Sequence, residues 1–277
     1  MEMTPRKDRM YRRNHLDKLD IAKDWLKRYT GSELSSFGNH ILITNFKQYM
    51  NLFSETENVP ILGLDSPMQV ATSKDGITMI NFGIGSPNAA LIMDLLTAIM
   101  PKAVLFLGKC GSLKKNIKVG DLILPIAGIR GEGTSDDYAD PKMPSLPSFR
   151  LQRAVSSTII NFNKDYYTGT VYSTNRRLWE TDSEFKNYLT KLRATAIDME
   201  TATVFIVGFM NNIPRGALLL VSDEPMTPDG IKTSESDKKV SSHFVEQHVQ
   251  IGIDSLRELK DSGESVKHLK FATDNSF

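Results

Sequence analysis

The sequence predicts an α/β protein with one domain, in which a mixed central β-sheet is flanked by helices. Short apolar runs of strand length alternate with longer segments of helical periodicity, which is typical of this class. The chain has 277 residues, 40% of them hydrophobic, and can bury a substantial core. No repeat or low-complexity linker divides it. We therefore expect a charged, frayed N-terminal segment over residues 1–20 and a single folded domain over residues 21–277.

The expected strands are apolar runs bounded by polar or turn-forming residues. They are HILIT (40–44), ITMINF (77–82), AVLFLG (103–108), DLILPIAGI (121–129), TGTVYST (168–174) and RGALLLVSD (215–223). Another short apolar run, within ATAIDMETATVF (194–205), gives way to a helix.

The expected helices follow these runs. Ser86 and Pro87 begin the first one, since proline is favoured in the first turn of a helix. The helical segments are NAALIMDLLTAIM (88–100), PSFRLQRAVSSTIINF (147–162), DSEFKNYLTKL (182–192), METATVFIVGFMNN (199–212) and SSHFVEQHVQIGIDSLRELKDS (241–262).

One connection is too long for an ordinary loop. Residues 130–147, RGEGTSDDYADPKMPSLP, are rich in Gly, Asp and Pro. Long loops on a rigid scaffold often carry function, so this segment is a candidate active-site loop. A surface insertion is the alternative.

Composition excludes several classes of protein. Lys and Arg number 34 against 33 for Asp and Glu, and a net charge of +1 gives no field that would gather nucleic acid or an anionic membrane. The single cysteine, Cys110, excludes an internal disulfide framework. The first 20 residues lack the apolar core of a secretory signal, and no apolar run approaches the roughly 20 residues that span a bilayer. We expect a cytoplasmic protein that binds neither nucleic acid nor membrane.

Ligands of open α/β sheets collect at the carboxyl ends of strands, so the residues that close each apolar run are site candidates. In FGIGSP, Gly83 and Gly85 allow close backbone approach before a helix whose free amides favour an anion or a hydroxyl; Asn88 stands where a dinucleotide turn would have its third glycine. A plain tight turn is the alternative. In GKCG (108–111), Lys109 puts a cation inside a second glycine-flexible turn, or is a surface lysine.

Two other strand ends carry acids. Asp198 and Glu200 flank Met199 where a strand becomes a helix, so they either cap that helix or accept hydrogen bonds from a polyhydroxylated ligand. Asp223 follows ALLLVS, and apolar surroundings should raise its pKa, which would let it deliver a proton near neutral pH. An N-cap is the alternative role for Asp223. A fifth segment, SESDKKVSSHF (234–244), places Lys238 and Lys239 before the last helix, where they could approach the same site.

These segments, in this order, resemble the nucleoside phosphorylase family, which also contains the purine nucleosidases. The resemblance covers about residues 38–260 and rests on the GIG turn, the GKCG turn, IDMETA and VSDEP. Further details are most similar to the AMP nucleosidase branch of that family, in its short form with the catalytic domain alone. They are RYTG (28–31), ILITNF (41–46), FGIGSPNAA (82–90), FLGKCGSL (106–113), RGEGTSDDY (130–138) and DEPMTPDGIKTSESDKKV (223–240).

The resemblance implies hydrolysis of the N-glycosidic bond of AMP to adenine and ribose 5-phosphate, with neither metal nor organic cofactor. By the same match, Asp223 protonates the departing purine, Glu200 binds the ribose 2′ and 3′ hydroxyls and Met199 packs on the ribose. Lys238 falls near the place where relatives carry an arginine that assists the acid.

One departure from the family bears on the nucleophile. Relatives that use inorganic phosphate have an arginine and a serine where this sequence has Phe106 and Lys109. Loss of a bidentate donor favours water as the nucleophile, while Lys109 could still bind an anion. Inorganic phosphate could act as an effector.

The 5′-phosphate and the base need further contacts that the sequence does not single out. The candidates for the phosphate are Gly85, Gly111, Arg28, Lys109, Arg130, Arg176 and Arg177. Trp179 either stacks on the base or belongs to a core or an interface.

Two alternatives stay open. One is a purine nucleoside or methylthioadenosine nucleosidase or phosphorylase on the same fold, and the other is a non-catalytic nucleotide sensor. Family members usually form hexamers or trimers of dimers, so the resemblance also implies a homo-oligomer, most often a hexamer.

Overall fold

The computed structural model describes residues 7–227, 230, 240 and 243–261. Its strands are β1 (His40–Thr44), β2 (Gln69–Thr72), β3 (Ile77–Asn81), β4 (Ala103–Ser112), β5 (Leu122–Gly131), β6 (Tyr167–Thr174), β7 (Ala196–Asp198) and β8 (Arg215–Asp223). Its α-helices are α1 (Lys7–Thr30), α2 (Lys47–Glu57), α3 (Ser86–Leu95), α4 (Phe149–Asn161), α5 (Ser183–Lys191), α6 (Thr201–Met210) and α8 (Val245–Asp261). α1 begins at Lys7, inside the segment that we expected to be frayed.

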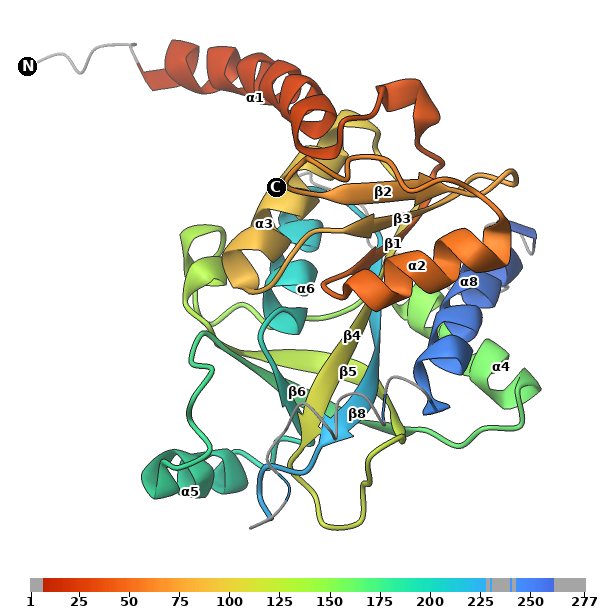
Figure 1. Cartoon of the computed structure of the whole chain (residues 1–277). Helices are drawn as coiled ribbons and strands as arrows, with labels where there is room; N and C mark the ends of the chain where they lie inside the picture. Colours follow the sequence, from red (N-terminus) through yellow and green to blue (C-terminus); the bar gives the residue numbers. More distant parts are fainter. Residues whose placement is uncertain (1–6, 228–229, 231–239, 241–242, 262–277) are drawn as a thin grey trace, which may run out of the picture.

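Within these residues the strands form one mixed sheet in the order β2-β3-β1-β4-β7-β6-β5-β8. A second pairing, between β4 and β8, closes β4, β7, β6, β5 and β8 into a ring. β1, β3 and β2 extend from β4 as an open wing (Figure 1). β1, β4 and β8 run parallel, so their carboxyl ends meet at one edge.

Helices cover both faces of the sheet. α3 and α6 pack on one face, and α2, α4 and α8 pack on the other (Figure 1). Each face has its own apolar core. All five residues of β1 are buried, as expected of a parallel strand covered on both sides. The structure thus confirms the predicted α/β class.

Sequence signals for the starts of two helices agree with the structure. Pro87 occupies the first turn of α3. Asp182 caps α5, because its carboxylate accepts the backbone N–H of Phe185 at 2.9 Å. None of the helices in the described ranges is both long and apolar enough to cross a membrane.

The prediction that GKCG leaves the strand as a turn was wrong. β4 continues to Ser112, and all of its residues are buried. The segment stays extended because β8 pairs with it on one side and β7 pairs with Gly111 and Ser112. The sequence also missed β2, a four-residue strand that pairs antiparallel with β3 at the edge of the sheet. Short edge strands of mixed polarity have little periodicity to detect.

Candidate active site

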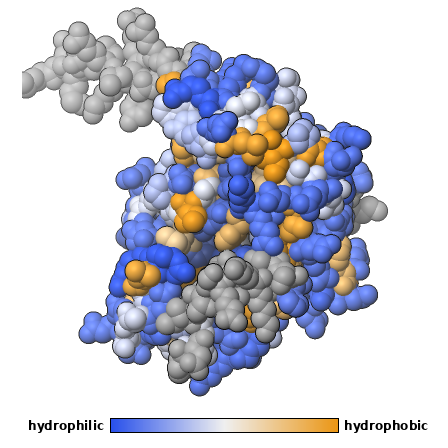
Figure 2. All heavy atoms as spheres, viewed as in Figure 1, coloured by the Kyte–Doolittle hydropathy of each residue, from blue (hydrophilic) through white to orange (hydrophobic). Residues whose placement is uncertain are grey.

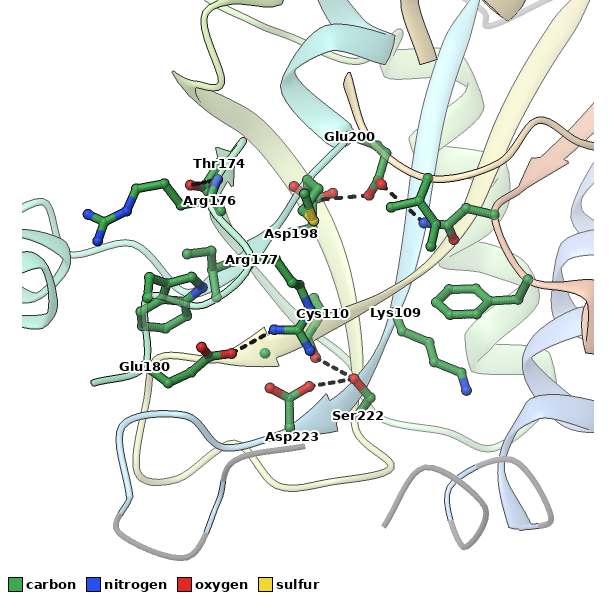
Figure 3. A pocket seen from close by; sticks show the side chains of 17 residues that line it. Lys109, Cys110, Thr174, Arg176, Arg177, Glu180, Asp198, Glu200, Ser222 and Asp223 are labelled. Carbon is green, nitrogen blue, oxygen red and sulfur yellow. Dashed lines mark hydrogen bonds and ion pairs between the residues drawn. The ribbon is translucent and has the colours of Figure 1, made fainter. Parts of the chain in front are cut away.

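A cavity of about 330 Å³ opens where the carboxyl ends of β1, β4, β6, β7 and β8 converge (Figure 3). Strand ends and the loops that follow them supply its walls. The lining residues are Asn45, Phe46, Ile84, Lys109, Cys110, Gly111, Thr174, Arg176, Arg177, Trp179, Glu180, Ile197, Asp198, Met199, Glu200, Ser222 and Asp223. Asp223, Glu200, Met199 and Lys109, which the sequence predicted as site residues, therefore share one cavity.

Asp223 ends β8 and lies beside a β-bulge. The register with β4 shifts there, so that Cys110 pairs with Val221 and Gly111 pairs with Asp223. Ser222 is the extra residue of the bulge, and its hydroxyl donates to Asp223 Oδ1 at 2.6 Å. A side chain at Gly111 would come within 3.1 Å of Asp223 Oδ2. Glycine at 111 thus leaves the space that the Asp223 carboxylate occupies.

Asp198 and Glu200 divide the two roles that the sequence left open. Asp198 Oδ1 accepts the Ser173 hydroxyl at 2.6 Å, and Oδ2 accepts the backbone N–H of Thr201 at 2.9 Å and the Thr201 hydroxyl. These bonds tie β7 to β6 and satisfy the first backbone N–H of α6. Both acids line the cavity (Figure 3). The contacts of Asp198 indicate a structural role, and Glu200 has one acceptor position left for a ligand.

Glu200 is held by three donors. Its Oε1 accepts the backbone N–H of Gly85 at 2.8 Å and the Asn45 Nδ2 at 3.1 Å, while its Oε2 accepts the backbone N–H of Met199 at 3.2 Å. Burial raises the pKa of Glu200 to about 8, and the nearby charge of Asp198 adds to this rise, although the three hydrogen bonds oppose it. Burial also raises the pKa of Asp198.

The GIG turn supports Glu200. Its second glycine, Gly85, does not line the cavity. Gly85 has φ +94°, a conformation that favours glycine, and its N–H is used by Glu200. The Ser86 hydroxyl donates to the Met199 carbonyl at 2.5 Å, which fixes the backbone between Asp198 and Glu200. Ile84, between the two glycines, reaches the cavity wall. The turn therefore positions the acid, and an anion would find the Gly85 amide already occupied.

Lys109 lies on β4 and lines the cavity (Figure 3). The side chain is largely buried, and its Nζ lies 4.8 Å from the centre of the Phe46 ring. Phe106, two positions upstream of Gly108, is fully buried against Phe82, with 5.9 Å between ring centres, and does not line the cavity.

Arg177, Glu180 and Trp179 form another wall, on the loop between β6 and α5. Arg177 Nη1 pairs with Glu180 Oε1 at 2.6 Å (Figure 3). Trp179 is 4% exposed and packs edge-on against Phe185, with 5.6 Å between ring centres. Trp179 is therefore a core residue that also borders the cavity.

The other candidate cations are engaged elsewhere. Arg176 lines the cavity, but its guanidinium pairs with Asp182 at 2.8 Å and lies over Phe185, pointing away from the other labelled side chains (Figure 3). Arg28 is exposed on α1, where its guanidinium lies 5.9 Å from the Trp25 ring centre, outside this cavity.

Arg130 holds its own loop together, and its guanidinium is nearly inaccessible. It donates to Ser135 Oγ at 2.8 Å, to Asp136 at 2.8 Å and to the carbonyls of Ala139, Asp140 and Met143. The long connection 130–147 thus starts as the end of β5, continues through a 3₁₀ turn and contributes no residue to the cavity. The structure does not support it as an active-site loop.

Sequence reasoning missed Asn45 and Glu180. Asn45 follows β1 directly, so the rule that singled out the other strand ends would have found it. Glu180 lies in a loop whose path no local pattern gives. Lys238 and Lys239 lie outside the described residues.

Comparisons with known proteins agree with this geometry. A family model, the phosphorylase superfamily, matches residues 40–257. The AMP nucleosidase of Escherichia coli (strain K12) is 28% identical over 95% of this chain and 64% of its own length. The chain thus spans about two thirds of that curated relative.

Solved structures of related proteins have a similar fold. The crystal structure of AMP nucleosidase from Bacteroides thetaiotaomicron is 52% identical, with a TM-score of 0.79 over 89% of this chain and 99% of that one. A uridine phosphorylase from Vibrio fischeri, 22% identical, shares the fold with a TM-score of 0.73 over 82% of this chain and 94% of its own. From the family match over most of its length, the chain belongs to the phosphorylase superfamily.

Proposed function

We propose that this protein hydrolyses the N-glycosidic bond of AMP and releases adenine and ribose 5-phosphate. The observation that carries the proposal is the convergence of Asp223 and Glu200 on one cavity at the strand ends. The substrate rests on the likeness to the two AMP nucleosidases.

Asp223 is the proposed acid. As the bond between ribose C1′ and purine N9 breaks, its electrons flow into the purine, and protonation of the imidazole nitrogen by Asp223 lowers the barrier. A water oxygen bonds to C1′ on the oxocarbenium-like sugar and gives up a proton. Glu200 accepts a hydrogen bond from the ribose diol, and Met199 packs on the ribose.

Water is the proposed nucleophile. A phosphorylase needs donors for inorganic phosphate, and the position where such relatives have an arginine is Phe106, which is buried among apolar side chains. Lys109 is a buried cation in the cavity wall, and we assign it to an anion, the 5′-phosphate of AMP or inorganic phosphate as an effector.

Arg177, Glu180 and Trp179 would border the base. We also propose a homo-oligomer, most often a hexamer in this family. We also propose a cytoplasmic location, which agrees with the absence of an internal disulfide framework in a chain with a single cysteine.

The testing experiment incubates the protein with AMP, adenosine and methylthioadenosine, each with and without inorganic phosphate, and separates the products. We expect adenine from AMP without added phosphate, and much slower release from the two nucleosides. Faster cleavage of adenosine or methylthioadenosine than of AMP would mean that the nucleoside, and not AMP, is the substrate. Binding of all three compounds without turnover would indicate a sensor.

A further inference from the structure

Asn45 has an unsatisfied acceptor next to Glu200. It lies immediately after β1 and lines the cavity. Its Nδ2 donates to Glu200 Oε1 at 3.1 Å, whereas its Oδ1 is buried and has no hydrogen-bond partner among the described residues. A buried polar atom without a partner costs about 1–3 kcal/mol, so such atoms in native sites call for an explanation.

The orientation of this amide follows from the network. Glu200 Oε1 already accepts the Gly85 N–H at 2.8 Å, so the group that faces this oxygen from Asn45 is the donor NH₂ and not the carbonyl. The amide oxygen is consequently the free end. The hydrogen bond to Glu200 therefore fixes where the Asn45 amide lies and which of its two ends is the oxygen.

The acceptor capacity of Glu200 is nearly used up by the protein. An ionised carboxylate has about four acceptor positions, and Gly85, Asn45 and Met199 occupy three of them. The two on Oε1 are full, and one remains on Oε2. A protonated Glu200 would offer fewer still. A ribose diol brings two O–H donors, so Glu200 cannot accept both hydroxyls while it keeps its present partners.

We propose that Asn45 shares the recognition of the ribose with Glu200: Asn45 Oδ1 accepts one ring hydroxyl, and Glu200 Oε2 accepts the other. This inference rests on the proposed function, because it presupposes a substrate with a ribose diol. Asn45 is then a specificity residue that touches the substrate, and Asn45 and Glu200 each read a different hydroxyl.

The test uses AMP, 2′-deoxy-AMP and 3′-deoxy-AMP with wild type, Asn45→Ala and Glu200→Gln. For each substrate, kcat/KM of the variant is divided by that of wild type, which cancels the intrinsic reactivity of deoxyribosides. Asn45→Ala should lose about tenfold on AMP, the size of one hydrogen bond, and clearly less on one of the deoxy analogues. Glu200→Gln should show its smallest loss on the other analogue.

Two further variants serve as controls for charge and for the loss of an amide side chain. Asn45→Asp retains Oδ1 but puts a second carboxylate by Glu200, so its overall activity should fall while its hydroxyl selectivity persists. Asn211→Ala is a matched amide deletion far from the cavity, where Asn211 bonds to Asp94, and should leave all three ratios near one. Thermal unfolding verifies that each variant is folded.

Equal losses for Asn45→Ala on all three nucleotides would overturn the inference and indicate a contact with water or a structural role. If wild type does not cleave AMP, the proposed function fails. The dissociation constants of the same three nucleotides then test Asn45 independently, with the same pattern expected.

Discussion

The position of Asp223 depends on its neighbours in β4. The bulge and the glycine at 111 let the carboxylate lie against the strand, where Ser222 donates to it. Asp223→Asn keeps the size of the side chain but removes the acidic proton. We expect kcat to fall by about 100-fold or more, with nucleotide binding retained, as measured by adenine release and calorimetry. Turnover close to wild type would show that another group protonates the purine.

Glu200 also makes the stability of the protein depend on pH. Its pKa in the fold, about 8, lies above the ordinary value of 4.5, so the folded state binds a proton that the unfolded state has released. The stability of the empty protein should therefore fall as pH rises from about 4.5 to 8, by at most about 1.4 kcal/mol per pH unit.

Glu200→Gln has no such proton and should show a flatter profile than wild type in this range. Urea unfolding at pH 5, 6.5 and 8 measures the difference. Parallel profiles for the two proteins would contradict a raised pKa for Glu200.

At the scale of elements, His248 joins α8 to β8 and α2. Its ring bonds to the Leu218 carbonyl at 3.0 Å and to the Tyr49 hydroxyl at 2.9 Å, and burial lowers its pKa to about 3, with a smaller contribution from Lys109. Because the unfolded histidine, with its ordinary pKa of 6.5, gains a proton first, acid should destabilise the fold from about pH 6.5 downward.

His248→Gln, which cannot titrate, should lose less stability than wild type between pH 7 and 5, by about 2 kcal/mol. Urea unfolding at these two pH values gives the comparison. An equal loss in both proteins would mean that the pKa of His248 is the same in the folded and unfolded states.

Most of the strands were predictable, because buried parallel strands are continuous apolar runs, whereas the helices α1 and α2 were not predicted. The end of β4 was not, since pairing with β7 and β8 keeps GKCGS extended. Strand ends located Asp223 and Glu200, yet the choice between Asp198 and Glu200 depended on contacts with Ser173 and Gly85, which are distant in sequence. Arg130 shows the converse: a conspicuous cation near the end of β5 binds the loop that follows it, outside the cavity.

At the scale of the molecule, apolar side chains remain exposed on the described surface. Ile84, at the cavity wall, is 64% exposed, and Leu178, beside Arg177, is 87% exposed. Figure 2 shows further apolar atoms gathered below α1. Exposed apolar patches often mark contacts between subunits. We expect light scattering to give a multiple of 31.0 kDa, and a monomeric mass would refute the predicted homo-oligomer.

The central claim is that this cavity transfers the ribose of AMP to water. Phosphorus NMR of a phosphate-free reaction with AMP, and of the same reaction with added inorganic phosphate, tests it most directly. We predict that the AMP resonance is replaced by that of ribose 5-phosphate in both samples and that added phosphate is not consumed. Ribose 1,5-bisphosphate, or no reaction until phosphate is added, would contradict the claim.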